Sequence, residues 1–434
     1  MLHEKVKHQL RISLEEFYPE WLKLQGEALD QKRVLTPERV GAYKISIEPY
    51  HGLNSRIRSM AHIPSHKGIQ ILKSTIDKFQ ASIVGYLATP GQSTFIGEIS
   101  RHIVCWCEYI DQKVKSSFSV HDAISDLIKD LDDTLSNGEV TREIFAPVDG
   151  LILGEEFDQI DLDSDFEVRK LTMAELQELV SEDVMFSNGR SELFRSTSTV
   201  IVHKQKTRFR LATFEEGGEP LPFDPNLYEP FEGLIACLHL LKPGKFSVIE
   251  YQHRFIPRVL PFQQFSTGSF RSNFLMPALQ INKDEADSLK KLYLAYYSIE
   301  WPALKIAIRR LGDAENRMSP TDSLLDSIIG LEVLLNPVER SELAFRVALH
   351  YSYLGEKAER KNRYDLMRKI QEIRNAIVHG GSTIGSTRAN EISIYSNHAK
   401  NCLREVILTL LNSGMVKGRK KIDSNFWLEF IMNE

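Results

Sequence analysis

The chain has 434 residues, of which 42% are hydrophobic and 26% are charged, with a formal net charge of −5 and a pI near 6.3. This composition excludes an intrinsically disordered chain, and it gives no global basic field of the kind that marks many nucleic-acid-binding proteins. The amino-terminal residues lack the apolar core of a signal peptide and no stretch has the length of a membrane span, so we predict a cytoplasmic protein without membrane contact.

The first region, residues 1–140, has the spacing of amphipathic helices. Long segments such as "SHKGIQILKSTIDKFQASIVGYL" and "RHIVCWCEYIDQKVKSSF" repeat apolar residues at intervals of three and four. We therefore predict a helical amino-terminal domain, to which the sequence assigns no role.

The pattern of apolar residues changes in the second region, residues 141–275. Short runs typical of strands, such as "VDGLILG", "STVIVHKQ", "RFRLATF" and "KFSVIEYQHRF", alternate with turn-forming stretches such as "SNGR" and "KPGK". We predict an α+β middle domain here.

Helical periodicity returns in residues 276–415. We predict an all-α bundle with helices near 284–313, 320–336, 341–355, 361–379 and 387–412. The second helix has a clear start, because Ser319 can cap it, Pro320 takes its first position and Asp322 lies three residues after the cap. A basic and aromatic tail, residues 416–434, follows the bundle. The predicted fold class is a multidomain, mainly α protein with an α+β middle domain.

The stretch "QEIRNAIVHGG" closes the fourth helix of this bundle. One apolar stripe runs along the helix through Leu366, Ile370, Ile373 and Ile377. At about 100° per residue, Arg374 lies roughly 70° from that stripe, whereas Asn375 and His379 lie on the opposite side. The two glycines that follow are typical of a helix end, so His379 is expected in the last turn, where the helix dipole favours a protonated imidazole.

An arginine and a histidine at such a helix end are the parts of a metal-free ribonuclease. The histidine can exchange a proton near neutral pH, and the arginine can bind a phosphodiester whose negative charge grows in the transition state. The RNA 2′-hydroxyl would be the nucleophile, leaving a 2′,3′-cyclic phosphate and a 5′-hydroxyl. One copy supplies one proton-transferring group, so a twofold dimer would supply both. The alternative is a solvated helix end with no chemical role.

Spacing alone is a weak signal for this chemistry. Arg56 and His62 in "RIRSMAH" have an acceptable spacing inside an unrelated region that we predict to be helical, and such matches arise by chance in a chain with 13 histidines. We discard that pair.

The longer context gives a family resemblance. Residues 319–381, "SPTDSLLDSIIGLEVLLNPVERSELAFRVALHYSYLGEKAERKNRYDLMRKIQEIRNAIVHGG", resemble the Apea-like branch of the HEPN superfamily. In that family a "D…ALE.LL" helix, an "ELSYRLA"-type helix and a terminal "R[ND]xxxHG" element occur in this order. The resemblance is close over residues 319–381 and extends in outline over 284–412. It implies a helical bundle that dimerises, and many members are metal-independent endoribonucleases whose paired Arg and His residues meet across the dimer cleft.

By this resemblance Arg374 is the phosphate clamp, Asn375 is the polar residue that follows it, and His379 is the general acid/base. The middle region also resembles the segment that precedes Apea-like HEPN domains in larger bacterial proteins, which implies a sensor or regulatory role. Some HEPN domains bind or dimerise without cleaving, so a non-catalytic module is the alternative that the resemblance leaves open.

Further charged residues fit a supporting role. Glu332 lies at the edge of the apolar face of its helix, where an unpaired carboxylate is costly, and Arg346 and Arg374 are its candidate partners. The pair is either a structural ion pair or a device that orients Arg374. Residues 356–374 hold seven Lys/Arg against four Asp/Glu, so Arg363, Arg368 and Lys369 either contact an RNA backbone or form a solvated helix face.

Other chemistries find no support in the sequence. The segment "DLDSDFE" imitates a calcium loop but has Phe166 where glycine is required, and we predict a strand and turn there. The four scattered cysteines lack zinc spacing, and phosphate-binding loops and hydrolase motifs do not occur. We therefore predict no metal and no cofactor.

The sequence as a whole predicts a conditionally activated endoribonuclease, acting in phage defence or in a toxin-like response. Its expected partners are RNA, with tRNA among the candidates, a second copy of the chain bound through the HEPN region, and an unknown activating ligand or protein. The alternative is a non-catalytic HEPN module that binds nucleotide or RNA and dimerises.

Overall fold

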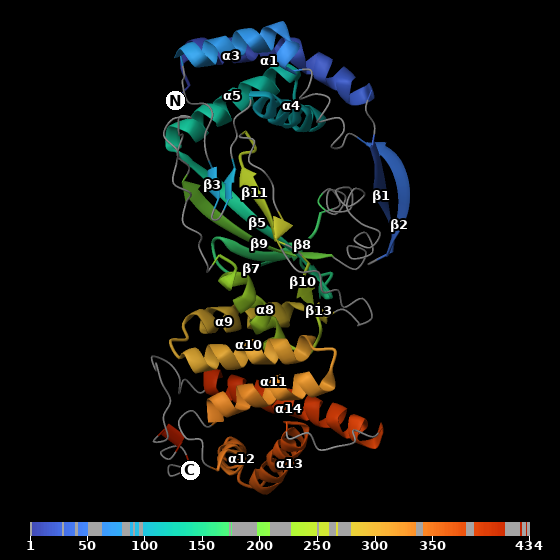
Figure 1. Ribbon diagram of the computed structural model, residues 1–434, viewed down its shortest axis with the longest axis vertical. Helices are drawn as coiled ribbons and strands as arrows, with labels where there is room; N and C mark the ends of the chain where they lie inside the picture. The colour runs from blue at the N-terminus through green and yellow to red at the C-terminus, as the bar shows by residue number, and fades with distance from the viewer. Residues whose placement is uncertain are drawn as a thin grey trace. The chain divides into compact units, whose positions relative to one another are not determined.

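The structure is a computed structural model, and it describes residues 2–27, 30–39, 42–50, 63–79, 87–89, 92–94, 99–172, 175, 198–208, 227–249, 251–259, 266–267, 279–335, 342–378, 386–412, 426–427 and 431. The chain divides into two compact units. The first comprises Met1–Asp149, Asp163–Pro225 and Val248–Arg271, and the second comprises Gly150–Leu162, Asn226–Ser247 and Ser272–Glu434. The described part is mostly helical with a smaller antiparallel sheet, as the sequence predicted (Figure 1).

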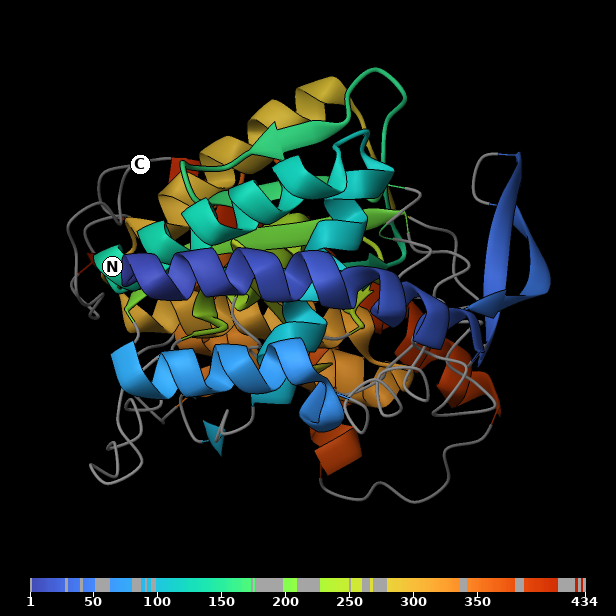
Figure 2. The same cartoon turned by 90° about the horizontal axis from the view of Figure 1, so that it is seen from above.

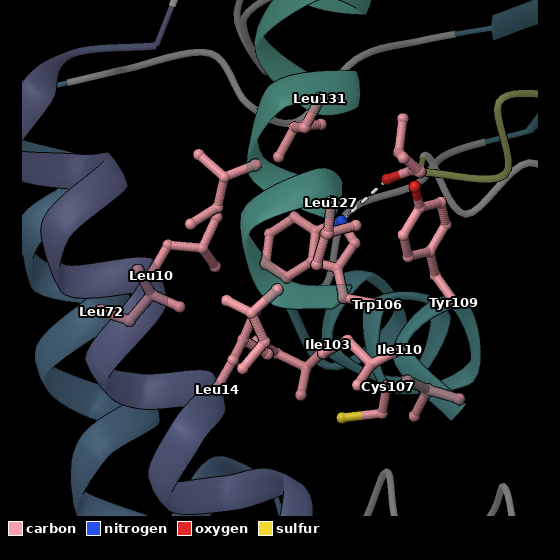
Figure 3. Packing of buried hydrophobic residues seen from close by; sticks show 14 of the residues in the cluster. Leu10, Leu14, Leu72, Ile103, Trp106, Cys107, Tyr109, Ile110, Leu127 and Leu131 are labelled. Atoms are coloured by element: carbon pink, nitrogen blue, oxygen red, sulfur yellow. Dashed lines mark hydrogen bonds between the residues drawn. The ribbon is translucent and has the colours of Figure 1, made fainter. Parts of the chain in front are cut away.

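In the described part of the first unit, four helices enclose one apolar core. They are α1 (Glu4–Glu27), α3 (Lys67–Phe79), α4 (Ile99–Lys115) and α5 (Val120–Asn137). Leu10, Leu72 and Leu127 are fully buried between them, and Trp106 donates its indole N–H to the Val259 carbonyl at 2.8 Å (Figure 3). Helices α1 and α3 lie side by side (Figure 2). The predicted helical character is confirmed at 67–79 and 99–115, whereas residues 80–86 of the first predicted segment lie outside the described residues.

Strands also occur within residues 1–140, so the prediction of a wholly helical amino-terminal region was wrong. Strands β1 (Asp30–Arg39) and β2 (Ala42–Tyr50) form an antiparallel hairpin, and β3 (Leu87–Thr89) pairs with β4 (Gln92–Thr94). The signal in the sequence was the alternation of Ile45 and Ile47 with polar residues, which is the period of a strand. The discarded pair Arg56 and His62 lies outside the described residues.

The sheet of the first unit is antiparallel. Its strands follow the order β12 (Ser266–Thr267), β11 (Tyr251–Ile256), β5 (Glu139–Asp149), β9 (Thr199–Arg208) and β8 (Phe166–Lys170). Strands occur within the runs predicted at residues 148–154, 198–205 and 245–255, whereas most of "RFRLATF" lies outside the described residues. The segment that imitates a calcium loop is a strand and turn, as predicted, between β7 (Gln159–Asp161) and β8.

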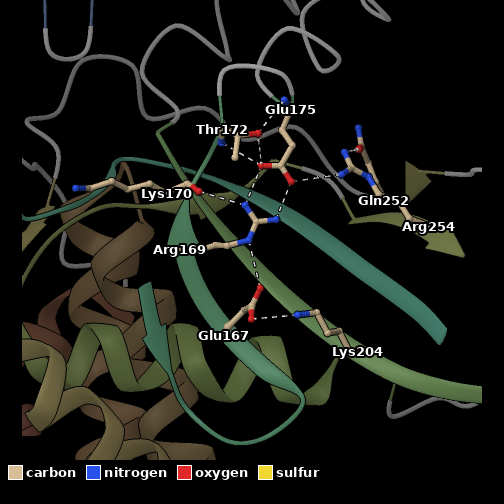
Figure 4. A network of polar contacts seen from close by, with 8 residues as sticks. All are labelled: Glu167, Arg169, Lys170, Thr172, Glu175, Lys204, Gln252 and Arg254. Atoms are coloured by element: carbon tan, nitrogen blue, oxygen red, sulfur yellow. Dashed lines mark hydrogen bonds and ion pairs between the residues drawn. The ribbon is translucent and has the colours of Figure 1, made fainter. Parts of the chain in front are cut away.

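A network of charged side chains covers part of this sheet (Figure 4). Arg169 donates to both carboxylate oxygens of Glu175 at 2.8 and 2.7 Å, and Arg254 lies 3.7 Å from the same group. Burial alone would raise the pKa of Glu175, but the hydrogen bonds from Arg169 and Thr172 lower that pKa to about 2. The carboxylate of Glu175 therefore interacts with both Arg169 and Arg254 of the same unit.

The second unit is a helical bundle with a small parallel strand pair. Its helices are α8 (Glu229–Leu241), α9 (Lys283–Tyr297), α10 (Pro302–Asn316), α11 (Pro320–Leu335), α12 (Leu343–Tyr353), α13 (Arg360–Val378) and α14 (Ser386–Asn412). Strand β13 (Leu279–Ile281) pairs with β6 (Leu151–Leu153). The short strand β10 (Ser247–Val248) lies where the chain passes from this unit to the first. Ser319 caps α11 as predicted, because its hydroxyl accepts the backbone N–H of Asp322 at 3.3 Å.

Two boundaries differ from the sequence prediction. The helix predicted near 284–313 is in fact two helices, because the chain leaves helical geometry after Tyr297 and Pro302 begins a new helix at its first position. The domain limits predicted at residues 140 and 275 also differ from the two units, since α8 belongs with the bundle and the amino-terminal helices belong with the sheet. The spacing of apolar residues indicates local conformation, whereas the division into units depends on contacts between segments that are distant in the sequence.

Buried charged side chains link three helices of the bundle. Arg404 of α14 forms an ion pair with Glu315 of α10 and donates through Nε to the carbonyl of His239 in α8 at 3.0 Å. Lys400 binds the other oxygen of Glu315 at 3.0 Å, and the side chains of Glu315 and Arg404 are only 5% and 10% exposed. His239 itself is buried against Phe246, with ring centroids 4.1 Å apart, and burial together with the charge of Arg404 lowers its pKa to about 3.

The aromatic part of the predicted tail packs on the same unit. Trp427 is buried and stacks on the imidazole of His350 in α12 with centroids 4.9 Å apart. The basic part, residues 417–421, lies outside the described residues.

Candidate active site at the end of helix α13

Two of the predicted site residues, Arg374 and Asn375, are carried by the last two turns of α13 (Arg360–Val378). Its fully or nearly buried side chains are Met367, Ile370, Gln371 and Ile373. The predicted apolar stripe is therefore correct at Ile370 and Ile373, while Leu366 and Ile377 are only half-buried. The buried face of α13 therefore also includes Gln371. Arg374, three residues after Gln371, is half-buried at the border of the core.

Glu332 of α11 and Arg374 of α13 form an ion pair. Arg374 Nη2 lies 3.9 Å from Glu332 Oε2, and the two side chains are 28% and 16% exposed. The sequence predicted that Glu332 would bind a cation, with Arg346 and Arg374 as the candidates. In the structure Arg374 is that partner. Arg346 of α12 is instead close enough to His350 for its charge to lower the pKa of that imidazole, in addition to the larger effect of burial.

Asn375 extends this arrangement towards solvent. Its side chain is exposed, and its Oδ1 accepts a hydrogen bond from Arg374 Nη1 at 3.1 Å. The guanidinium is thus held between a carboxylate on its inner side and an amide on its outer side, with the remaining N–H groups available to an anion. His379, the predicted general acid/base, and the two glycines after it lie outside the described residues.

The contacts of the Glu332 carboxylate only partly offset the cost of burying its charge. Burial raises its pKa, and the nearby charge of Arg374 and the amide of Gln371 only partly oppose this effect. Glu332 Oε1 and Gln371 Nε2 are both buried, and neither has a partner at hydrogen-bonding geometry in the described part of the chain. Sequence analysis missed Gln371, although a glutamine between Ile370 and Ile373 on a buried face was a signal that could have drawn attention to it.

A poorly compensated carboxylate should cost stability, and this predicts the behaviour of Glu332→Gln. Because the folded state holds a proton on Glu332 more tightly than the unfolded state, the ionised group destabilises the fold at neutral pH, and this cost disappears as the pH falls below the pKa. We expect Glu332→Gln to unfold at a higher urea concentration than wild type at pH 7, with the difference shrinking towards pH 4. If the variant is less stable than wild type at pH 7, the Glu332–Arg374 pair stabilises the fold and the ionised carboxylate does not destabilise it.

The other predicted supporting residues have different surroundings. Arg363 is largely buried, where it binds Glu405 at 2.6 Å and lies 4.1 Å from the centre of the Tyr351 ring. These contacts describe a structural role, and RNA contact by Arg363 stays a prediction. Lys369 lies 3.4 Å from Glu391 and 3.9 Å from Glu372 on the surface. Arg368 is half-buried and lines a pocket with the first turn of α12.

In comparisons with protein families, with curated proteins and with solved structures, nothing matches this chain. Among the residues that the structure describes, no group of three or more His, Cys, Asp or Glu side chains is placed to hold a metal ion. No helix within those residues has both the length and the apolarity needed to cross a membrane.

Proposed function

We propose that the chain is a metal-independent endoribonuclease of the HEPN type that acts in the cytoplasm as a homodimer. The observation that carries the proposal is the position of Arg374, which an inward carboxylate and an outward amide hold at the end of α13, one turn before His379 in the sequence. The order of the capped helix α11, α12 and α13 supports it, because the resemblance rests on these three helices.

In this mechanism each residue has one task. Arg374 binds the scissile phosphate and offsets the charge that develops in the transition state, while Asn375 limits the rotation of the guanidinium. His379 exchanges the proton of the RNA 2′-hydroxyl or of the leaving 5′-oxygen, and the same residue of a second copy performs the other transfer. The first unit, most of which precedes the bundle in the sequence, fits a nuclease under conditional control, in phage defence or in a toxin-like response, with an activating ligand or protein as partner.

The alternative is a non-catalytic module that binds nucleotide or RNA and dimerises. The ion pair with Glu332 is the observation that favours it, because Arg374 already has a partner inside the bundle. The two functions differ in what they require of His379, since a binding site tolerates its replacement and a nuclease does not.

Cleavage of labelled total RNA and tRNA by the purified full-length chain in EDTA tests the proposal. We expect wild type to produce fragments with 2′,3′-cyclic phosphate and 5′-hydroxyl ends, and His379→Ala to produce none. Fragments with other ends, or equal cleavage by His379→Ala, would refute the mechanism. RNA that is bound but left intact by both proteins, with and without cell extract as a source of activator, would favour the binding module.

A further inference from the structure

A pocket opens between the first turn of α12 and the exposed side of α13. Glu342, Leu343, Ala344, Phe345 and Arg368 line it, and its volume is about 450 Å³. We call it the α12–α13 pocket. This volume is within the range of pockets that bind small organic ligands.

The cation in this pocket differs from its neighbours in its partners within the described part of the chain. Arg368 is half-buried, yet it forms no ion pair or hydrogen bond with any residue that the structure describes. The neighbouring cations differ, since Arg363 binds Glu405, Lys369 faces Glu391, and Arg374 binds Glu332. A partly buried guanidinium that makes no ion pair with a described residue is an arrangement that an anionic group of a ligand would complete.

An exposed aromatic ring lies beside this cation. The side chain of Phe345 is 45% exposed, and its ring packs against Tyr364 of α13 with centroids 6.2 Å apart and the ring planes at 72°. This edge-to-face contact fixes the Phe345 ring while leaving part of it open to solvent. Exposed aromatic rings near cations are the platforms on which proteins stack the bases of single-stranded nucleic acids.

The combination fits a nucleotide better than a bare phosphate. A free anion would meet Glu342 as well as Arg368, whereas a nucleotide brings base amino groups from which a carboxylate accepts hydrogen bonds. The base must be unpaired, since a base inside a duplex cannot present its face to Phe345.

The pocket lies on the same side of α13 as Asn375 of the candidate active site. Tyr364, Arg368 and Asn375 follow at intervals of four and seven residues, so they lie within about 40° of one another around α13. Arg368 and Asn375 are separated by about 10 Å along the helix axis, a distance that neighbouring nucleotides of one strand can span.

We infer that the α12–α13 pocket is a subsite for an unpaired nucleotide of the RNA substrate, with the base stacked on Phe345 and a phosphate bound by Arg368. This inference rests on the proposed ribonuclease function and adds the place on the chain where an unpaired nucleotide of the RNA binds. Strands that cannot place an unpaired nucleotide here bind weakly.

The test is the binding of a fluorescent 2′-O-methyl oligonucleotide to the full-length chain, followed by anisotropy. This probe lacks the 2′-hydroxyl nucleophile, so binding is measured without cleavage and independently of whether the chain is a nuclease. We expect Phe345→Ala and Arg368→Ala each to weaken binding of the single strand about fivefold or more. Arg368→Ala should also reduce the slope of log affinity against log salt by about 0.7, the effect of one lost phosphate contact. The same sequence as a duplex should bind weakly to all proteins.

Matched substitutions on α9 provide the controls. Lys291→Ala removes an exposed cation and Leu294→Ala an exposed apolar side chain, and both should bind the single strand as wild type does. Phe345→Leu keeps the apolar bulk and removes the aromatic face, so its binding should still fall even if Phe345→Ala misfolds.

Two results would overturn the inference. One is wild-type affinity in Arg368→Ala and in folded Phe345 variants, and the other is a change from dimer to monomer in those variants without loss of RNA binding, which would make the pocket a protein contact. Cleavage of unmodified RNA is assayed separately. Retained cleavage with unchanged binding rejects the subsite alone, whereas weakened binding with no cleavage by wild type rejects the nuclease and leaves the subsite standing.

Discussion

Arg374→Ala should lower the rate of RNA cleavage by about 10²- to 10³-fold, the usual effect of removing one preorganised group that stabilises transition-state charge. Arg374→Lys should recover little of this loss, because an ammonium group cannot make the paired hydrogen bonds of a guanidinium to a phosphate or keep the contacts with Glu332 and Asn375 together. The measurement is single-turnover cleavage of a labelled RNA in EDTA by the full-length proteins.

The same substitution should also change stability, and the two effects can be separated. Without Arg374 the carboxylate of Glu332 loses the cation that opposes the burial-driven rise of its pKa, so Arg374→Ala should be less stable than wild type at pH 7 and approach wild type at pH 4. The double variant Arg374→Ala/Glu332→Gln removes the buried charge as well. We expect it to regain stability at pH 7 without regaining cleavage.

This double variant decides between the two interpretations of the ion pair. If it cleaves RNA as wild type does, Arg374 serves only to neutralise Glu332 and the candidate site is wrong. If Glu332→Gln alone slows cleavage about tenfold while raising stability, Glu332 orients Arg374 at a cost to the fold, as groups that position a functional side chain commonly do.

Local signals in the sequence were sufficient for much of the bundle. Ser319 and Pro320 mark the start of α11 by chemistry that acts within one turn. The partner of Glu332 was also within reach, because a carboxylate on an apolar face requires a cation and only a few were suitably placed. These features depend on contacts over short distances along a helix or on a simple electrostatic requirement.

Other features depended on packing that periodicity does not report. Nothing local distinguishes Arg363, which binds Glu405 across the bundle, from Arg368, which has no partner among the described residues. The helix break before Pro302 was predictable from the proline itself but was hidden by apolar spacing that continues on both sides. The grouping of α8 with the bundle required knowledge of which distant segments lie together.

Arg404→Ala should have the largest effect on the stability of the second unit. Arg404 links α14 to Glu315 of α10 and to the carbonyl of His239 in α8, and both charged side chains are at most 10% exposed. Its removal leaves Glu315 with Lys400 as its remaining partner in the described chain and leaves a buried carbonyl without its donor. Breaking a buried pair in this way costs about 3–5 kcal/mol, a large part of the 5–15 kcal/mol that stabilises a typical domain.

Urea unfolding of the full-length chain measures this effect, with Arg309→Ala as the matched control. Arg309 also lies on α10 and pairs with Glu232 of α8, but at 3.8 Å and with both side chains about half exposed, so its loss should cost less than about 1 kcal/mol. The double variant Arg404→Leu/Glu315→Leu should be more stable than Arg404→Ala, because it removes the buried carboxylate together with its partner. Equal and small effects of Arg404→Ala and Arg309→Ala would show that the network specifies the packing of these helices without stabilising it.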